Sequence, residues 1–242
     1  MTYPGKYIAA DVEIGHHITW QVPGLGAVNV DTILTTLIAG TIVFGFAMYV
    51  ARRVTSGMPS KAQLIWETVV GSVQRQVDES IGPTAPFVVP LAVCLFFFIL
   101  ISNWLELIPS GHHPEYLPPP TADVNFTFAL ALVVLIWAWA TAIHRKGLAT
   151  WLGGFARPYK ALIPINVIEQ VTKPLSLSLR LFGNIFAGSI MLAVLALLPA
   201  YVLWLPNAVW KAFDVIFIGA IQAFIFALLT ILYFSFELGE GH

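Results

Sequence analysis

A single arginine stands in the middle of a long apolar segment, in line with four other polar residues. The segment covers residues 169–189 and has the sequence EQVTKPLSLSLRLFGNIFAGS. Its polar residues are separated by four, three, four and four positions, a spacing that places them on one face of a helix. The chemistry open to such a face is the handling of protons or other ions inside a membrane. The five residues are Glu169, Lys173, Ser176, Arg180 and Asn184.

Arg180 is the costly member of this face. The steps from Glu169 to Arg180 cover ~16 Å of helix, about half of a ~30 Å hydrocarbon core. An arginine at that depth costs about 2.5 to 3.5 kcal/mol on insertion scales, and it does not escape by losing its proton. Either it reaches an interface or an acid of its own bundle, or it serves an ion path and is compensated from outside this helix. The apolar sequence on both sides favours the ion path.

The composition indicates a membrane protein with several spans. Of the 242 residues, 58% are hydrophobic and 10% are charged, whereas soluble domains have roughly 25% charged residues. The mean hydropathy is +0.81. A net charge of -1 without a basic cluster gives no indication of nucleic-acid binding. The single cysteine, Cys94, excludes an intramolecular disulfide, and no cleavable signal is expected, so the first span directs insertion.

The apolar segments predict an all-α, polytopic membrane protein with five membrane-embedded helices. We expect a tail at residues 1–31 and a single membrane domain at residues 32–242. Residues 60–81 are too polar to span, so they are predicted to form an amphipathic helix at the interface, the alternative being a helix in a soluble loop. The spans are predicted at residues 32–51, 84–108, 123–143, 164–198 and 207–236.

The last two predicted helices are longer than the membrane is thick. As one helix, residues 164–198 would extend ~52 Å, well beyond ~30 Å of hydrocarbon. The final helix has a similar excess, so we expect the two to form a steeply tilted hairpin. Gly183, Ala187 and Gly188 keep one surface of the earlier helix thin, which permits another helix to approach closely.

The basic residues predict the orientation of the chain. Eight of them fall in two connections on the same side of the membrane, and the positive-inside rule places that side in the cytoplasm. Five spans then put the amino terminus outside and the carboxyl terminus in the cytoplasm. The eight residues are Arg52, Arg53, Lys61, Arg75, Arg145, Lys146, Arg157 and Lys160.

Enzyme motifs are absent from the sequence, and we expect neither a cofactor nor a metal site. There is no nucleophile elbow, phosphate-binding loop or zinc-protease motif. His16 and His17 are adjacent, so they project differently and make a poor pair of metal ligands. The remaining chemistry is that of polar groups within the spans.

Several polar residues besides Arg180 are candidates for lining an ion path. Asp214 has apolar neighbours about two turns into the last helix, which favours a path role. Gln222 either lines the path or hydrogen-bonds two helices together. Asp123 either lines the path or caps the third span, and Glu106 either lines an outer water pocket or faces the headgroups. Ser189, on the outer half of the fourth helix, is a further candidate.

Four stretches of the chain carry a resemblance to a known family. In chain order they are SNWLELIP (102–109), ADVNFTFALAL (122–132), PLSLSLRLFGNIFAG (174–188) and IQAFIFALLTILYF (221–234). Together they resemble subunit a of the F-type ATP synthase, in a bacterial and most nearly actinobacterial form. The likeness extends over essentially everything from Asp31 onward, and the RLFGN motif with the downstream QAFIF is its most specific part.

The resemblance implies a non-catalytic stator subunit of the bacterial plasma membrane, working in ATP synthesis. Its neighbours would be a rotating ring of c subunits, each with a membrane-buried carboxylate, b-type peripheral-stalk subunits, other synthase subunits and lipid. Arg180 matches the family's essential arginine, Asn184 the asparagine one turn on, and Gln222 the glutamine of the last helix. Glu106 and Asp123 match acids of the outer access path.

The chain departs from the best-known bacterial pattern at two positions. Ser189 stands where a glutamate is often found, and Val215 stands where a histidine is often found. The outer path therefore lacks its usual pair of titratable groups. We infer from its position that the neighbouring Asp214 replaces them, an assignment that the resemblance does not itself supply.

The implied mechanism depends on the permanent charge of Arg180. A cation within ~4 to 6 Å lowers the pKa of a carboxyl group by roughly 1 to 3 units, so a ring carboxyl arriving there releases its proton. Two offset half-channels would supply and remove protons, driven by ~2.3 kcal/mol per charge per 100 mV. The outer one is expected near Asp214, Gln222, Glu106 and Asp123, and the inner one near Glu169 and Lys173.

Two other classes of function predict different properties. In a secondary transporter Arg180 would bind an anionic substrate, and such proteins normally show two related halves with helices broken near the midplane. No such repeat is visible in the sequence. In a purely structural anchor, residues 60–81 would be the docking surface, and neutralising Arg180 would leave ion conduction unchanged.

Overall fold

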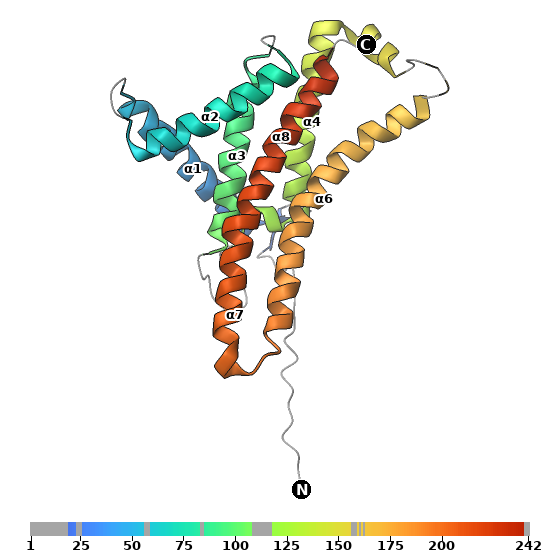
Figure 1. Cartoon of the computed structure of the whole chain (residues 1–242). Coiled ribbons are helices and arrows are strands. Elements are labelled where there is room, and N and C mark those ends of the chain that lie inside the picture. Colours follow the sequence, from blue (N-terminus) through green and yellow to red (C-terminus); the bar gives the residue numbers. More distant parts are fainter. Residues whose placement is uncertain are drawn as a thin grey trace.

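A computed structural model of the chain describes residues 19–22, 26–55, 59–82, 85–107, 118–155, 159, 161 and 163–239. Helices dominate this part of the chain, as the all-α prediction requires (Figure 1). Five of them are long and apolar enough to cross a membrane, and the last covers 38 residues. The predicted number of spans is thus confirmed. They are α1 (Val30–Arg53), α3 (Val88–Leu105), α4 (Val124–Lys146), α6 (Ile163–Leu195) and a final helix at Tyr201–Leu238.

The final helix begins earlier than the sequence predicts. It consists of α7 (Ala200–Ala212), a π-helical segment η3 (Phe213–Ile218) and α8 (Gly219–Leu238). The predicted start near Asn207 is wrong because Pro206 lies inside α7 and does not precede it. Prolines are tolerated within membrane helices, where neighbouring groups satisfy the freed backbone atoms. Pro199 is the residue that precedes the helix.

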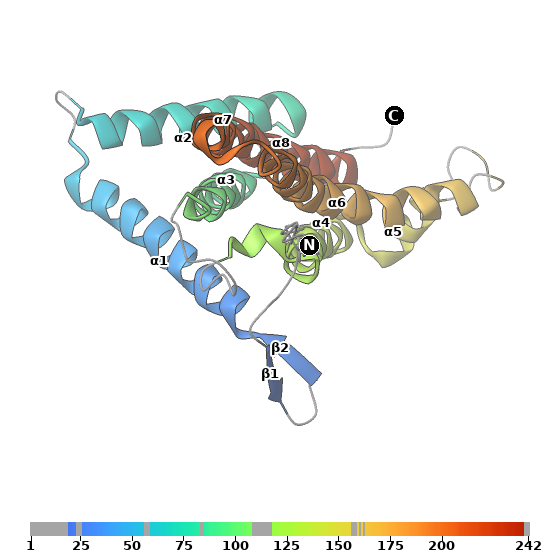
Figure 2. The ribbon, with the colours of Figure 1, turned by 90° about the horizontal axis from the view of Figure 1, so that it is seen from below.

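The core forms around α3, which packs along α8 and also contacts α1 and α2. Helix α4 packs against both α8 and α6. Figure 2 shows α3 and α4 between α1 on one side and the α6, α7 and α8 group on the other. Fully buried apolar side chains fill these contacts, among them Ile99, Leu135, Leu181 and Phe226.

The amphipathic segment forms α2 (Lys61–Ser80), a helix that lies across one end of the molecule (Figure 1). Ser60 caps it by accepting a hydrogen bond from the Gln63 backbone N–H at 3.3 Å. Its far end is tied to the last helix, since the Ser235 hydroxyl donates to the Ser80 carbonyl oxygen at 2.6 Å. The ends of α1, α4 and α8 that carry basic or acidic side chains lie at this same end.

Three short elements were not predicted from the sequence. An antiparallel hairpin of β1 (Thr19–Val22) and β2 (Gly26–Asn29) lies within the expected tail. A 3-10 turn, η1 (Pro120–Ala122), precedes α4, and a seven-residue helix, α5 (Leu148–Gly154), follows it. Residues 1–18 and 23–25 of the predicted tail, including His16 and His17, lie outside the described residues, as do Arg157 and Lys160.

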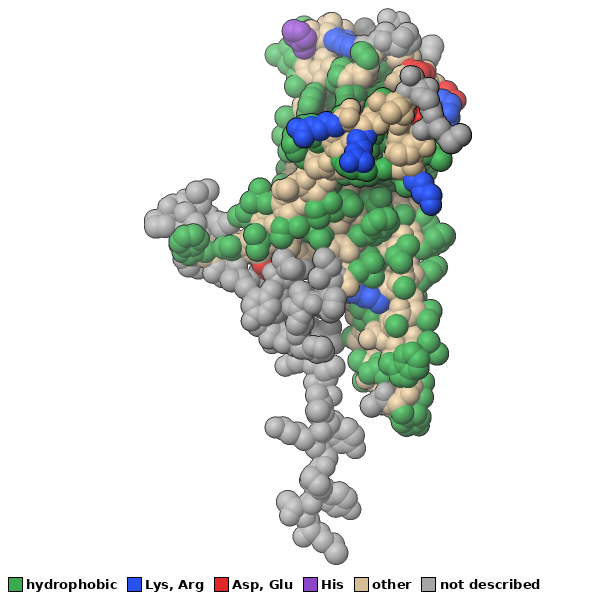
Figure 3. Space-filling model, turned by 90° about the vertical axis from the view of Figure 1, so that its left-hand side faces the viewer, with side chains coloured by type: hydrophobic (Ala, Val, Ile, Leu, Met, Phe, Trp, Pro, Cys, Tyr) green, Lys and Arg blue, Asp and Glu red, His purple; other side chains and the backbone are tan. Residues whose placement is uncertain are grey.

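The surface of the molecule separates charge from apolar side chains. Figure 3 shows most blue side chains toward the upper end of the face in view, with an isolated blue patch lower down among largely hydrophobic side chains. The basic residues of the last turns of α1 and α4, Arg52, Arg53, Arg145 and Lys146, belong to that upper end. Such a distribution is what a multi-pass membrane protein with one basic side requires.

Candidate functional site

Arg180 lies near the middle of α6 on its exposed side. Leu177, Leu181 and Ile185 are buried residues of this helix, which packs along α4. Among the residues that the structure describes, no carboxylate forms an ion pair with Arg180. The hydroxyl of Tyr233, on α8, lies within range of its charge. The guanidinium is therefore open toward the outside of this chain.

The residues next to Arg180 on its face of α6 have small side chains. Ser176 and Ala187 are exposed one to two turns away on the same side. A Cβ atom at Gly183 would meet nothing within 4 Å. Ser176, Arg180, Gly183 and Ala187 form a strip of one long cation among small residues, which we call the open strip.

Three charged residues gather where α3, α7 and η3 meet, toward the end away from α2 that the sequence predicts to be the outer one. Glu106, at the end of α3, accepts a hydrogen bond from the Lys211 ammonium of α7 at 2.8 Å. Asp214 lies three residues after Lys211, in η3, and is 5% exposed. A Cβ atom added to Gly188 of α6 would collide with the Asp214 carboxylate. Asp214 therefore lies directly against the fourth helix, and we call Glu106, Lys211 and Asp214 the outer cluster.

The π-helical geometry of η3 is relevant to the position of Asp214. A π-helical turn inserts an extra residue into the helical repeat and changes which side chains face a neighbouring helix, and such turns are frequent at functional sites. Here Asp214 and Val215 are the buried residues of the segment, whereas Phe213, Ile216 and Phe217 are exposed. Nothing in the sequence predicts this irregularity.

Further polar groups lie where α3 packs closely on α8, next to the outer cluster. The Asn103 amide donates to the Gly219 carbonyl oxygen at 3.2 Å and accepts from the Thr121 hydroxyl at 2.8 Å. A Cβ atom at Gly219 would lie 3.1 Å from the Asn103 Cβ, so the contact favours glycine. Gln222, one turn further along α8, is buried at 6% exposure. Asn184 is half-buried, and neither amide is hydrogen-bonded to another described residue.

Asp123 lies apart from the outer cluster in its contacts. One carboxylate oxygen accepts from the Asn125 backbone N–H at 2.8 Å, which caps α4. The other accepts from the Asn29 amide at 2.7 Å and from the Thr32 hydroxyl at 3.2 Å. The capping alternative raised by the sequence is thus realised in the structure, and the same carboxylate also fastens α1 to α4.

The inner half of α6 carries the second cation of the predicted polar face. Lys173 lies 3.6 Å from a carboxylate oxygen of exposed Glu169 and 3.8 Å from one of buried Glu237. Its ammonium also donates to the Gln170 amide oxygen at 3.4 Å. We call Lys173, Gln170 and Glu237, with Trp151 of α5, the inner cluster.

Ser189 lies on the other half of α6. Its hydroxyl donates to the Ile185 carbonyl oxygen at 2.9 Å.

Sequence reasoning missed Glu237, Gln170 and Trp151. The only available signal was an acid at the end of the last apolar run, which is equally expected of a residue facing headgroups. Outer Glu106 and Asp214 are brought together with Lys211, and Lys173 is brought together with Glu169. Arg180 stands between these two groups along α6, in contact with neither through an ion pair among the described residues.

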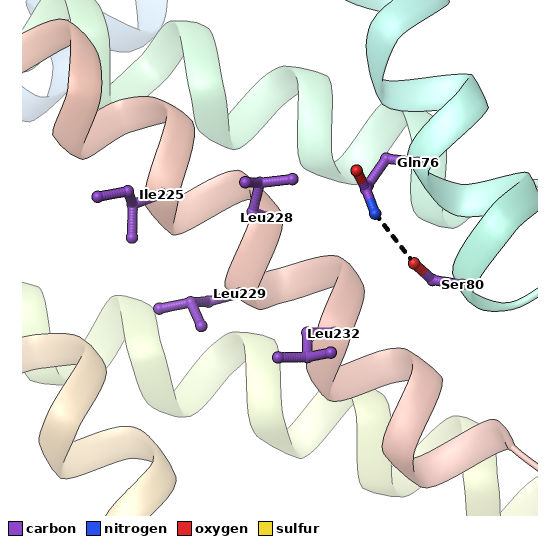
Figure 4. Close-up of a pocket in the computed structure, with 6 residues that line it drawn as sticks. All are labelled: Gln76, Ser80, Ile225, Leu228, Leu229 and Leu232. Carbon is purple, nitrogen blue, oxygen red and sulfur yellow. Dashed lines mark hydrogen bonds between the residues drawn. The ribbon is translucent and has the colours of Figure 1, made fainter.

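A groove of about 320 Å³ lies between α2 and α8. Its walls are Ile225, Leu228, Leu229 and Leu232 with the side chains of Gln76 and Ser80, which share a hydrogen bond of 3.2 Å (Figure 4). None of these six residues is titratable, so the groove is no candidate for proton transfer. Among the described residues, no group of three His, Cys, Asp or Glu side chains is placed to hold a metal ion.

Comparison with known proteins gives one consistent result. Residues 33–235 match the family described as ATP synthase A chain. A protein of Acidothermus cellulolyticus named ATP synthase subunit a is 52% identical over 235 residues, which cover 97% of this chain and 86% of the relative. The protein of that name from Mycobacterium bovis is 50% identical, covering 97% and 98%. A protein named ATP synthase subunit a 1 from Photobacterium profundum is 33% identical over the full length of both.

Proposed function

This chain belongs to the ATP synthase subunit a family, and from that premise we propose that it is the proton-conducting stator subunit beside a ring of c subunits. In this role Arg180 meets the membrane-buried carboxylate of each ring subunit in turn. Membership of the family makes the chain a multi-pass protein of the bacterial membrane and a component of the membrane sector that serves ATP synthesis. The chain would perform no catalysis by itself.

The exposure of Arg180, without an ion pair to any other described residue, is the observation that carries the proposal. A guanidinium within the hydrocarbon is expensive unless it is compensated. Among the described residues nothing in its own chain supplies an ion pair. The anion that stabilises it would come from another polypeptide, and the open strip leaves room for a helix to pass close by.

The charge of Arg180 would drive proton release from that carboxyl group. A permanent cation nearby favours the carboxylate form, because it lowers the pKa of a neighbouring acid. The bare carboxylate would pass the arginine and be reprotonated on the other side. The same fixed charge would repel a hydrated proton, so protons would not leak directly from one side of the membrane to the other.

The outer half-channel is proposed to run past the outer cluster toward Gln222 and Asn184. In support of this, Glu106 and Lys211 are partly exposed while Asp214 is buried against α6, so the charged groups extend from the surface inward.

Asp214 would take the place of the titratable pair that is absent at Ser189 and Val215. Val215 is itself buried at 2% exposure and has no group to exchange a proton. Asp123 would contribute at most from the edge, since its oxygens already accept three hydrogen bonds.

The inner half-channel is proposed to open near Glu169 and Lys173. Residues 163–173 of α6, which precede Pro174 and which we call the arm of α6, lie toward the basic end of the molecule (Figure 1). Glu169, on this arm, has a side chain that is 60% exposed. The basic ends of α1 and α4 support a cytoplasmic position for that end. The amino terminus would then be outside and the carboxyl terminus in the cytoplasm. Besides the c ring, we expect b-type peripheral-stalk subunits, other synthase subunits and lipid as neighbours.

The test is replacement of Arg180 by alanine in the complete synthase. We expect Arg180→Ala to lower ATP-driven proton pumping by about 100-fold or more, because it removes a charge that acts on the reacting group. The complex should still assemble, since Arg180 is exposed and forms no ion pair with any other residue that the structure describes. Pumping at the normal rate by assembled complexes carrying Arg180→Ala would refute the assignment.

A further inference from the structure

Glu237, in the last turn of α8, is a buried acid that the proposed proton path does not use. Its side chain is 6% exposed. One carboxylate oxygen accepts from the Gln170 amide of α6 at 2.8 Å, and the other accepts from the Trp151 indole N–H of α5 at 2.9 Å. The Lys173 ammonium lies 3.8 Å from the first oxygen. Three helices therefore converge on this one carboxylate.

The surroundings of Glu237 satisfy its charge. A buried carboxylate is costly unless hydrogen bonds and an opposite charge compensate it. Gln170 is held in one orientation, because its oxygen accepts from the Trp139 indole N–H of α4 at 3.2 Å and from Lys173 at 3.4 Å. Its amide nitrogen is thus directed at Glu237. The inner cluster is a built, fully engaged network and not a chance meeting of surface charges.

The network holds the part of α6 that has few other contacts with α8. Figure 1 shows the first half of α6 leaning away from α8, with the two helices diverging toward the end where α5 lies. Pro174 follows Lys173 directly and removes a backbone hydrogen bond inside α6, which weakens the helix there. The Tyr233 hydroxyl of α8 adds a bond of 3.3 Å to the Lys173 carbonyl oxygen.

Arg180 lies two helical turns, ~10.5 Å, beyond Lys173 on nearly the same face. Any pivoting of α6 at Pro174 would change the angle between the arm and the segment that carries Arg180. We propose that Glu237 is a positioning residue, which through Gln170 and Lys173 fixes the arm of α6 to α8 and so sets where Arg180 stands. This inference rests on the proposed function of Arg180 and deepens it.

The first experiment compares Glu237→Ala, Glu237→Gln and Glu237→Asp in the complete synthase. We expect Glu237→Ala to lower ATP-driven proton pumping by about tenfold to 100-fold, because displacement of a reacting group by ~1 Å has effects of that size. Glu237→Gln, which keeps the shape but loses the charge, should lie between alanine and wild type. Glu237→Asp, which keeps the charge, should recover most of the rate. Glu67→Gln is the control, since Glu67 also accepts a bond from a glutamine, at 2.7 Å, but is itself exposed and has that partner on its own helix, α2.

The second experiment measures the position of the arm directly. Spin labels at Ile168 of α6 and Leu232 of α8, both exposed, report the separation of the two helices in the assembled complex. The chain's single cysteine, Cys94, is first replaced by alanine. We expect a broader distance distribution in Glu237→Ala than in wild type, and a wild-type distribution in Glu237→Asp and Glu67→Gln.

The outcomes separate this inference from the proposed function. If Arg180→Ala abolishes pumping while Glu237→Ala leaves both the pumping rate and the distance distribution unchanged, Glu237 positions nothing and only the inference fails. A pumping loss in Glu237→Ala with an unchanged distance distribution would also overturn it, because the effect would not pass through the arm. If Arg180→Ala pumps normally, the proposed function itself has failed.

Discussion

Lys173 and Arg180 lie two turns apart on nearly the same face of α6, but they differ in burial and in ion pairing. Lys173 is 10% exposed, has two carboxylates of its own chain within 4 Å, and stands over the ring of Phe236. Arg180 is exposed and has no ion pair among the described residues. One cation is used inside the chain to hold helices together. The other would be available to a partner, which is what the proposed stator role beside a moving carboxylate requires.

The largest effect should come from exchanging the two kinds of cation. Arg180→Lys should lower ATP-driven pumping by about 100-fold, because a compact ammonium lacks the planar fork of a guanidinium and can lose its proton. The reverse exchange, Lys173→Arg, should retain most of the rate, since its partners are carboxylates and an amide that a guanidinium also satisfies. Proton pumping by inverted membrane vesicles measures both. Equal losses in the two variants would remove the distinction between the cations.

A smaller effect is expected at the outer cluster. Asp214→Asn keeps the size of the side chain but cannot exchange a proton, so pumping and synthesis should fall by about tenfold or more. Asp78→Asn on exposed α2 is the matched control and should have no effect. Rates of ATP synthesis driven by an imposed proton gradient provide the measurement. A fully active Asp214→Asn variant would exclude Asp214 as the replacement acid.

Two glycines of α6 offer a comparison of packing on its two sides. Gly188→Ala should disturb the outer cluster, because the added methyl group meets the Asp214 carboxylate. Overpacking of this kind costs typically about 1 to 3 kcal/mol, and we expect a severalfold loss of pumping. Gly183→Ala enters open space within this chain, so it should leave the thermal stability of the isolated subunit in detergent unchanged. A lower midpoint of thermal unfolding for Gly183→Ala than for Gly188→Ala would contradict the conclusion that Gly188 is closely packed and Gly183 is not.

The smallest effect should come from the exposed partner of Lys173. Glu169 forms a pair with Lys173 one turn away and is 60% exposed, and such pairs on helices contribute about 0.3 to 0.5 kcal/mol. Glu169→Gln should therefore change the pumping rate less than twofold at physiological ionic strength. Buried Glu237, replaced in the same way, should have the greater effect. The reverse order would mean that the exposed acid, and not the buried one, matters to Lys173.

The spans were predictable from the sequence because an apolar run of about twenty residues is compatible with few structures other than a membrane-spanning helix. The position of Arg180 within its helix followed from residue spacing alone. The early start of α7 was not predictable, because a proline such as Pro206 is more readily accommodated in the first turn of a helix than in its interior. Glu237 was missed for a related reason: its bonds join residues 67 and 86 positions apart. The Glu106 and Lys211 pair, 105 positions apart, is a similar case.

In the proposed function, the anion that compensates Arg180 belongs to another polypeptide. A density map of the assembled membrane sector, at a resolution that shows side chains, would show where that anion lies. We predict that the guanidinium faces a ring of helices, with a carboxyl group of that ring at its level and the open strip against the ring. Arg180 paired with an acid of its own chain, or extended to the lipid headgroups, would contradict the account.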